Sequence, residues 1–218
     1  PPVRLARAGK RLAAATLVAA VAAAGVSALL YHKAVAEIGP LSLNDAQQVS
    51  TVVIDRDEKL LRPFTTADGR WRLPIEPDEA DQRYLKMLFA FEDRRFYEHN
   101  GIDTRGIARA LWQDIRSQSV VEGGSTITQQ FVKNAYVRNQ KTLARKVREA
   151  ALAWQLEQRW PKDRILLAYL NTIYFGNGAY GIQQAARTYF DKGAGRLTLA
   201  ESALLSGLPA DPSLYDPT

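Results

Sequence analysis

The chain has 218 residues, of which 46% are hydrophobic and 24% charged, the balance of an ordinary globular protein with room for one sizeable domain. It contains no cysteine and only two histidines, which excludes disulfides and thiolate metal sites and argues against a zinc site. Residues 1–40 carry five basic side chains and one acidic one, and so hold +4 of the formal charge of +6. The basic pI therefore gives little support to a nucleic-acid partner.

An uncharged run of 20 positions, residues 12–31, follows four basic side chains in residues 1–11. A helix of this length spans the hydrocarbon core of a bilayer, and the positive-inside rule places the basic tail in the cytoplasm. We expect a single-pass transmembrane anchor, then a linker over residues 32–50 and an extracytoplasmic domain over residues 51–218. A cleaved signal peptide is the alternative, because the small residues at 22–25 suit a peptidase, and either interpretation exports the domain.

The exported part begins with a β-like segment and then becomes helical. Residues 51–75 read as short strands joined by turns, and Asp68-Gly69 is the better turn signal. Apolar residues then recur at helical spacing. The first expected helix starts at residue 78. Further helices are expected over 104–117, 126–137, 141–159, 162–173 and 182–190. A last helix is expected from the capping box Thr198–Glu201 to a stop at Gly207. We expect a loop over 171–181 and a mainly α domain with a small β segment.

Glu92 lies on the apolar face of the first expected helix, because it follows Leu88 by four residues and Phe89 by three. Such surroundings would raise the pKa of the carboxyl group and make it a better proton acceptor near neutral pH. The alternative is a carboxylate at a helix end that pairs with Arg94 or Arg95.

Residues 123–130 read GGSTITQQ, a flexible loop that enters a helix where free backbone N–H groups and hydroxyls can receive an anion. The spacing is neither that of a P-loop nor that of a nucleophile elbow. The alternative is a glycine hinge with a Ser or Thr helix cap.

Basic side chains dominate residues 123–148, which contain no acidic residue before Glu149. The six are Lys133, Arg138, Lys141, Arg145, Lys146 and Arg148. Cations that converge along one helix face suit a phosphate or diphosphate. The alternatives are anionic lipid headgroups and a solvated face with an Arg145–Glu149 pair that contributes only about 0.2–0.5 kcal/mol.

Five segments in this order resemble the motifs of the peptidoglycan glycosyltransferases. These are membrane-anchored enzymes, free-standing or fused to a penicillin-binding transpeptidase, that polymerise glycan strands from lipid II. The segments are EDRRFYEHNGID (92–103), GGSTITQQ (123–130), RKVRE (145–149), ILLAYLNTIYFGNGAYGIQQAA (165–186) and ESALLSGLPADPSLYDP (201–217). The resemblance implies a lysozyme-like, mainly helical domain with a lobe partly sunk in the bacterial cytoplasmic membrane.

The resemblance also implies roles for individual residues. Glu92 corresponds to the catalytic base that takes the proton from the acceptor 4-hydroxyl, and Glu149 to a second essential carboxylate near the donor diphosphate. The substrate-binding positions that it implies are Asp93, Ser125, Gln130, Lys133, Lys141, Arg145 and Asn171. By its local sequence alone, Asn171 fits the corner of a core better than a sugar site. Leu167 departs from the family pattern because it stands where a glutamate is usual.

The sequence requires no cofactor, although a divalent cation, Mg²⁺ or Mn²⁺, could lie near a diphosphate and the Glu92-Asp93 pair without any ligand spacing that demonstrates it. The partners implied are lipid II, the growing glycan strand, the membrane and other cell-wall synthesis proteins. Two rival functions stay open: a lysozyme-like lytic enzyme and a non-catalytic membrane-anchored scaffold. The six basic side chains of residues 123–148, called the basic stripe below, argue against the lytic enzyme, because glycan cleavage has no use for a diphosphate site.

Overall fold

The computed structural model describes residues 50–56, 60–67, 69–117, 124–136 and 143–212, together with residues 16, 18, 21–22, 25–29 and 32. The described positions before residue 33 are helical and exposed. Lys141 and most of the expected anchor and linker lie outside the described residues. Within the described part of the chain, no helix is both long enough and apolar enough to cross a membrane.

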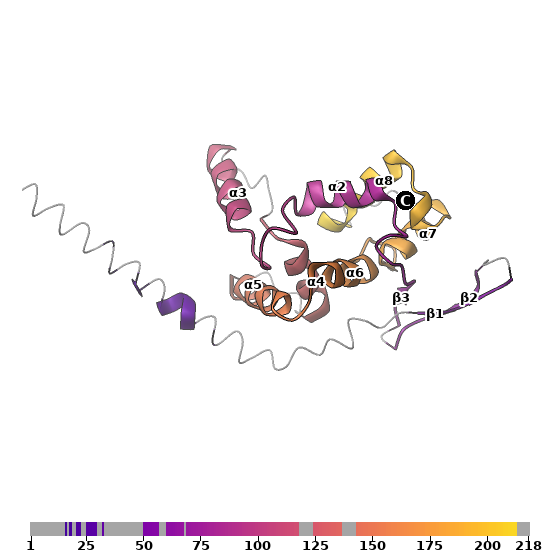
Figure 1. Cartoon of the computed structure of the whole chain (residues 1–218), viewed down its shortest axis with the longest axis horizontal. Coiled ribbons are helices and arrows are strands. Elements are labelled where there is room, and N and C mark those ends of the chain that lie inside the picture. The colour runs from indigo at the N-terminus through magenta and orange to yellow at the C-terminus, as the bar shows by residue number, and fades with distance from the viewer. Residues whose placement is uncertain are drawn as a thin grey trace, which may run out of the picture.

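The domain is mainly helical, as the sequence predicts. The helices are α2 (Gln82–Glu92), α3 (Thr104–Ser117), α4 (Ile127–Tyr136), α5 (Leu143–Glu157), α6 (Lys162–Thr172), α7 (Ile182–Phe190) and α8 (Leu199–Gly207), with the 3₁₀ turns η2 (Ala194–Arg196) and η3 (Leu208–Ala210). In Figure 1, α4, α5 and α6 form one group, α2 lies beside α8, and α3 projects from the end of the helical body. The loop between α2 and α3 is therefore a junction between the body and a projecting arm.

The β segment forms two small sheets. β1 (Thr51–Ile54) and β2 (Leu60–Phe64) make the expected antiparallel hairpin. β3 (Trp71–Arg72) pairs in parallel with β4 (Ala179–Tyr180). The expectation of a loop throughout 171–181 is therefore wrong at the two residues of β4, and also at residues 171–172, which end α6. A two-residue strand has no period of its own, and its partner lies far away in the sequence.

The start of the first long helix differs from the expected one, whereas the bounds of the last helix agree. α2 begins at Gln82 rather than at residue 78, because the Asp81 side chain accepts from the Arg83 N–H at 2.8 Å and caps the helix there. The capping box that opens α8 is confirmed. The end of α8 at Gly207 is also confirmed, although the φ of Gly207, −87°, is right-handed and the chain tightens directly into η3.

The core holds the helices together through large side chains from most of them. Its fully buried members are Tyr84, Tyr169, Phe96, Phe131, Phe175, Leu88, Ile127, Leu152, Leu156, Ile165, Leu170 and Ile182. Tyr84 from α2 and Tyr169 from α6 are the largest of them, and both are 0% exposed. Burial of these side chains fixes the end of α2 against α4 and α6, which is where the candidate site lies.

Candidate active site

Glu92 is the last residue of α2, and its half-buried carboxylate accepts a hydrogen bond from Nε2 of Gln130 on α4. Burial raises the pKa of the Glu92 carboxyl group; the hydrogen bond from Gln130 opposes this increase, and the charge of Asp93 adds to it. The expected direction is therefore confirmed. Glu92 is a carboxylate held by one neutral donor in partly apolar surroundings, which suits a proton acceptor.

The alternative in which Glu92 pairs with a neighbouring arginine is wrong. Arg94 donates from Nε to the Ala90 carbonyl at 2.9 Å. Arg95 forms an ion pair with Asp103, the residue that caps α3 by accepting from the Gly106 N–H at 2.8 Å. Both arginines are thus used to shape the junction, and among the described residues no ion pair joins either of them to Glu92.

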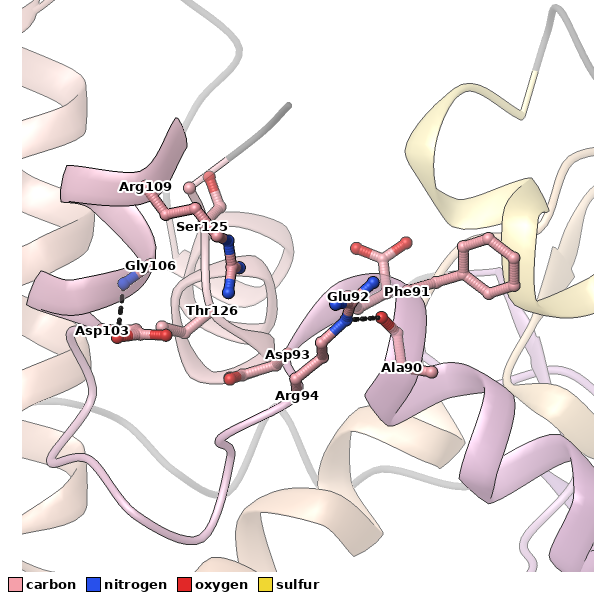
Figure 2. Close-up of a pocket in the computed structure, with 11 residues that line it drawn as sticks. Ala90, Phe91, Glu92, Asp93, Arg94, Asp103, Gly106, Arg109, Ser125 and Thr126 are labelled. Atoms are coloured by element: carbon pink, nitrogen blue, oxygen red, sulfur yellow. Dashed lines mark hydrogen bonds between the residues drawn. The ribbon is translucent and has the colours of Figure 1, made fainter. Parts of the chain in front are cut away.

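A pocket opens beside Glu92, between the end of α2, the start of α3 and the segment before α4 (Figure 2). Its lining consists of Ala90, Phe91, Glu92, Asp93, Arg94, Asp103, Gly106, Arg109, Gly124, Ser125 and Thr126. Figure 2 shows Glu92 and Ser125 on opposite walls, and Arg109 on α3 also lines the pocket. The first and second sequence motifs therefore meet at one pocket, and α3 adds a cation that the sequence did not single out.

Asp93 has a different environment from Glu92 although the two are adjacent. Its side chain is buried, lies 2.9 and 3.0 Å from Nε2 of His99, and accepts from the backbone N–H of Ile127 at 3.1 Å. Ile127 is the first residue of α4, where an anion is favoured by the free N–H groups and the helix dipole. Asp93 therefore fastens the end of α2 to the start of α4 while it also lines the pocket, and its assignment to substrate binding stays a prediction.

Glu149 lies on α5 with its side chain 1% exposed, between two cations of the same helix. Arg145 Nε and Lys146 Nζ each lie 3.0 Å from a Glu149 oxygen. Lys146 also donates to Oγ of Ser125 at 2.5 Å. Lys146, to which neither the basic stripe nor the third motif gave a role of its own, thus joins the pocket wall at Ser125 to the buried Glu149.

The remaining candidates are not gathered at this pocket. Lys133 is exposed on the last turn of α4, and Lys141 lies outside the described residues. Asn171 is buried on α6, where its amide accepts from the Ile75 N–H and donates to the Ile75 carbonyl, each at 2.9 Å. Its amide also donates to the Leu167 carbonyl. Asn171 thus holds the segment after β3 against α6. This agrees with the interpretation of Asn171 as part of a corner of the core, and it does not support a contact with substrate.

A divalent cation held by the Glu92-Asp93 pair does not fit these residues. Oδ1 of Asp93 already faces Nε2 of His99 and Oδ2 accepts from the Ile127 N–H, which leaves Glu92 as the single available carboxylate of the pair. Within the described ranges, no three His, Cys, Asp or Glu side chains come close enough together to hold a metal ion.

The comparisons with known proteins agree with this geometry. The profile of the family described as Transglycosylase matches residues 57–218, which include both walls of the pocket. The chain belongs to the transglycosylase family. The match confirms the family-level resemblance, and the mainly helical architecture with small sheets is consistent with the lysozyme-like domain that the resemblance implies.

Relatives of this transglycosylase include long penicillin-binding proteins. Penicillin-binding protein 1F of Bacillus subtilis is 45% identical over 146 residues, which are 67% of this chain and 20% of the relative. Penicillin-binding protein 4 of the same organism is 40% identical over 173 residues, 79% of this chain and 26% of the relative. Penicillin-binding protein 1A of Neisseria lactamica is 52% identical over 130 residues, 60% of this chain and 16% of the relative. The chain thus spans about a quarter or less of these relatives.

Proposed function

We propose that this transglycosylase domain is a peptidoglycan glycosyltransferase that polymerises lipid II into β-1,4 glycan strands. The observation that carries the proposal is the Glu92 carboxylate, half-buried, raised in pKa and oriented by Gln130 at the edge of a pocket whose other wall bears Ser125 and Arg109. A raised carboxyl pKa matches a proton acceptor to work near neutral pH.

In the proposed reaction the acceptor 4-hydroxyl gives its proton to Glu92 while its oxygen attacks the anomeric carbon of the donor sugar. The bond from that carbon to the lipid diphosphate breaks, and the electron pair leaves with the diphosphate. Attack opposite an α-linked diphosphate yields a β-linked product by inversion. Proton transfer to a positioned base contributes about 10²–10⁴-fold to such a rate.

The cations near the pocket suit the negative charge that develops on the departing diphosphate. Arg109 lies on the pocket wall in Figure 2, and Lys146 reaches that wall through Ser125. Fixed cations aimed at developing charge stabilise a transition state without reorganisation. Glu149 keeps the ammonium of Lys146 in place through the 3.0 Å contact, which gives this buried carboxylate a role near the donor.

We further propose that residues 12–31 anchor the protein in the bacterial cytoplasmic membrane, with the domain on the outer side. A domain held there would meet lipid II at the surface of the bilayer that carries it. The growing strand and other cell-wall synthesis proteins are the partners that follow from this location.

The experiment that tests the function is a lipid II polymerisation assay in detergent, with the products sized on a gel. Wild type should give a ladder of strands, and Glu92→Gln should give none, because the amide cannot accept the proton. Glu98→Gln is the matched control: Glu98 is exposed, lies in the same motif and does not line the pocket, so this variant should retain the ladder. A ladder from folded Glu92→Gln would contradict the assignment of the base.

The same assay separates the rival functions. A lytic enzyme would shorten preformed glycan and make no ladder from lipid II. A scaffold would do neither, and its properties would not depend on Glu92. Moenomycin is a phosphoglycolipid inhibitor of the peptidoglycan glycosyltransferases that this chain resembles, so loss of the wild-type ladder when it is added would support a donor site for a lipid-linked phosphate.

A further inference from the structure

Tyr169, a core residue of α6, reaches the candidate base through one intermediate side chain. Its hydroxyl donates to Oε1 of Gln130 at 3.2 Å, and Nε2 of the same amide donates to Oε2 of Glu92. The three residues come from α6, α4 and α2 and form a continuous chain of hydrogen bonds. We propose that Tyr169 is a positioning residue that fixes the amide of Gln130 with its N–H₂ toward Glu92, and so keeps the base oriented.

The direction of this chain follows from which groups can donate. An ionised carboxylate only accepts hydrogen bonds, so the side of the amide that faces Glu92 must be the N–H₂ group. Oε1 of Gln130 then faces Tyr169, whose hydroxyl can donate to it. Burial raises the pKa of the Tyr169 phenol well above its usual value, and the charge of Glu92 adds to the increase. Tyr169 therefore keeps its proton and remains a donor over the whole working range of pH.

Removal of the Tyr169 hydroxyl would release this constraint. The Gln130 amide could then rotate and present Oε1 to the carboxylate, which is repulsive while Glu92 is ionised. A carboxylate that loses a hydrogen bond to its charged form has a higher pKa. We therefore expect Tyr169→Phe to raise the pKa of Glu92 by about one unit, which lowers the ionised fraction about tenfold well below that pKa.

Tyr84 supplies a matched control within the same core. It is also 0% exposed and close enough to Glu92 for the Glu92 charge to raise the pKa of its phenol, behind burial as the main cause. Its hydroxyl has no hydrogen-bond partner among the described residues. Tyr84→Phe thus removes the same atom from the same environment without breaking the chain to Glu92.

Other charges near Glu92 stay constant in both variants. The titratable or charged groups that lie around it are Asp93, Tyr84, Tyr169, Arg94, Asp103 and Arg109. None of them is changed by Tyr169→Phe except Tyr169 itself, which is neutral in the wild type. A shift that appears in this variant alone therefore reports the hydrogen-bond chain.

The proposal rests on Glu92 as the base of the proposed function, so the experiment has one readout that does not need turnover. The full chain is labelled with ¹³C at the glutamate carboxyl carbon, and Glu92 is titrated by NMR after its signal is assigned from the Glu92→Gln spectrum. We expect a higher Glu92 pKa in Tyr169→Phe and an unchanged one in Tyr84→Phe. In a Gln130→Met background, Tyr169→Phe should add no further shift, because the intermediate is already absent.

Activity provides the second readout. The acid limb of the kcat profile should move to higher pH in Tyr169→Phe, with KM nearly unchanged, because the base acts in the transition state. An unchanged Glu92 pKa in Tyr169→Phe, or an equal shift in both tyrosine variants, would overturn the proposal. A selective NMR shift without polymerisation by wild type would instead support the positioning role and refute the proposed function.

Discussion

Replacement of Asp93 tests whether this residue fastens α2 to α4. Asp93→Ala leaves the His99 ring and the Ile127 N–H without their buried acceptor. A helix cap contributes about 0.5–2 kcal/mol, and a buried donor left unsatisfied costs about 1–3 kcal/mol. We therefore expect a loss of about 1.5–5 kcal/mol in the free energy of unfolding. Asp93→Asn keeps one oxygen for Ile127 and should cost about 1–2 kcal/mol.

Thermal unfolding of the purified chain measures this loss. At about 2–4 °C per kcal/mol for a chain of this size, Asp93→Ala should lower Tm by on the order of 10 °C. Asp163→Ala is the control, because Asp163 is exposed and accepts one hydrogen bond, from the Tyr97 hydroxyl at 3.1 Å; it should cost less than about 1 kcal/mol. Equal, small changes of Tm in Asp93→Ala and Asp163→Ala would refute the fastening role.

Two further predictions concern stability. Gly101→Ala should lower Tm more than Gly178→Ala. Both glycines have positive φ (83° and 71°), but only a Cβ on Gly101 would meet the Ala153 backbone, at 2.7 Å. Equal losses of Tm would mean that the loop at Gly101 can move away from Ala153. The pKa of Asp81 is lowered from 3.8 to about 2, chiefly by its hydrogen bond with Arg83, so its ionised form stabilises the fold above about pH 4 and that contribution is lost as the pH falls toward 2. Asp81→Asn should lack this part of the acid sensitivity in melts recorded at several pH values, and an unchanged profile would contradict the assignment.

Periodic sequence patterns predicted most helices and the β1–β2 hairpin correctly. The amphipathic spacing that ends at Glu92 identified α2, and the Thr198–Glu201 capping box identified the start of α8. The start of α2 was placed too early, because Asp81 caps the helix locally and residues 78–80 lie before it. The strand β4 was missed because two residues carry no pattern and depend on a distant partner.

The residues of the pocket were likewise predicted in part from the sequence and in part only visible in the structure. The motifs identified Glu92 and Ser125, and the structure brings both to one pocket. The contribution of Arg109 was not visible, because it lies on a helix outside any of the motifs and reaches the pocket only after α3 is placed. The assignment of Asn171 to substrate was suggested by its motif, whereas its amide is engaged by the backbone of Ile75, a contact between residues far apart in the chain.

The sequence by itself determined that the chain has a mainly helical domain of the transglycosylase family with a carboxylate on an apolar helix face. It placed Glu92 on that face and Asp93 among the substrate-binding positions, but it could not show which donors each carboxylate would meet. The tertiary structure supplies these donors: Asp93 meets the free N–H at the start of α4, whereas among the described residues Glu92 accepts from the amide of Gln130 alone. The number and kind of donors around a carboxylate decide whether it fixes the fold or remains able to accept a proton, and those donors come from helices that only folding brings together.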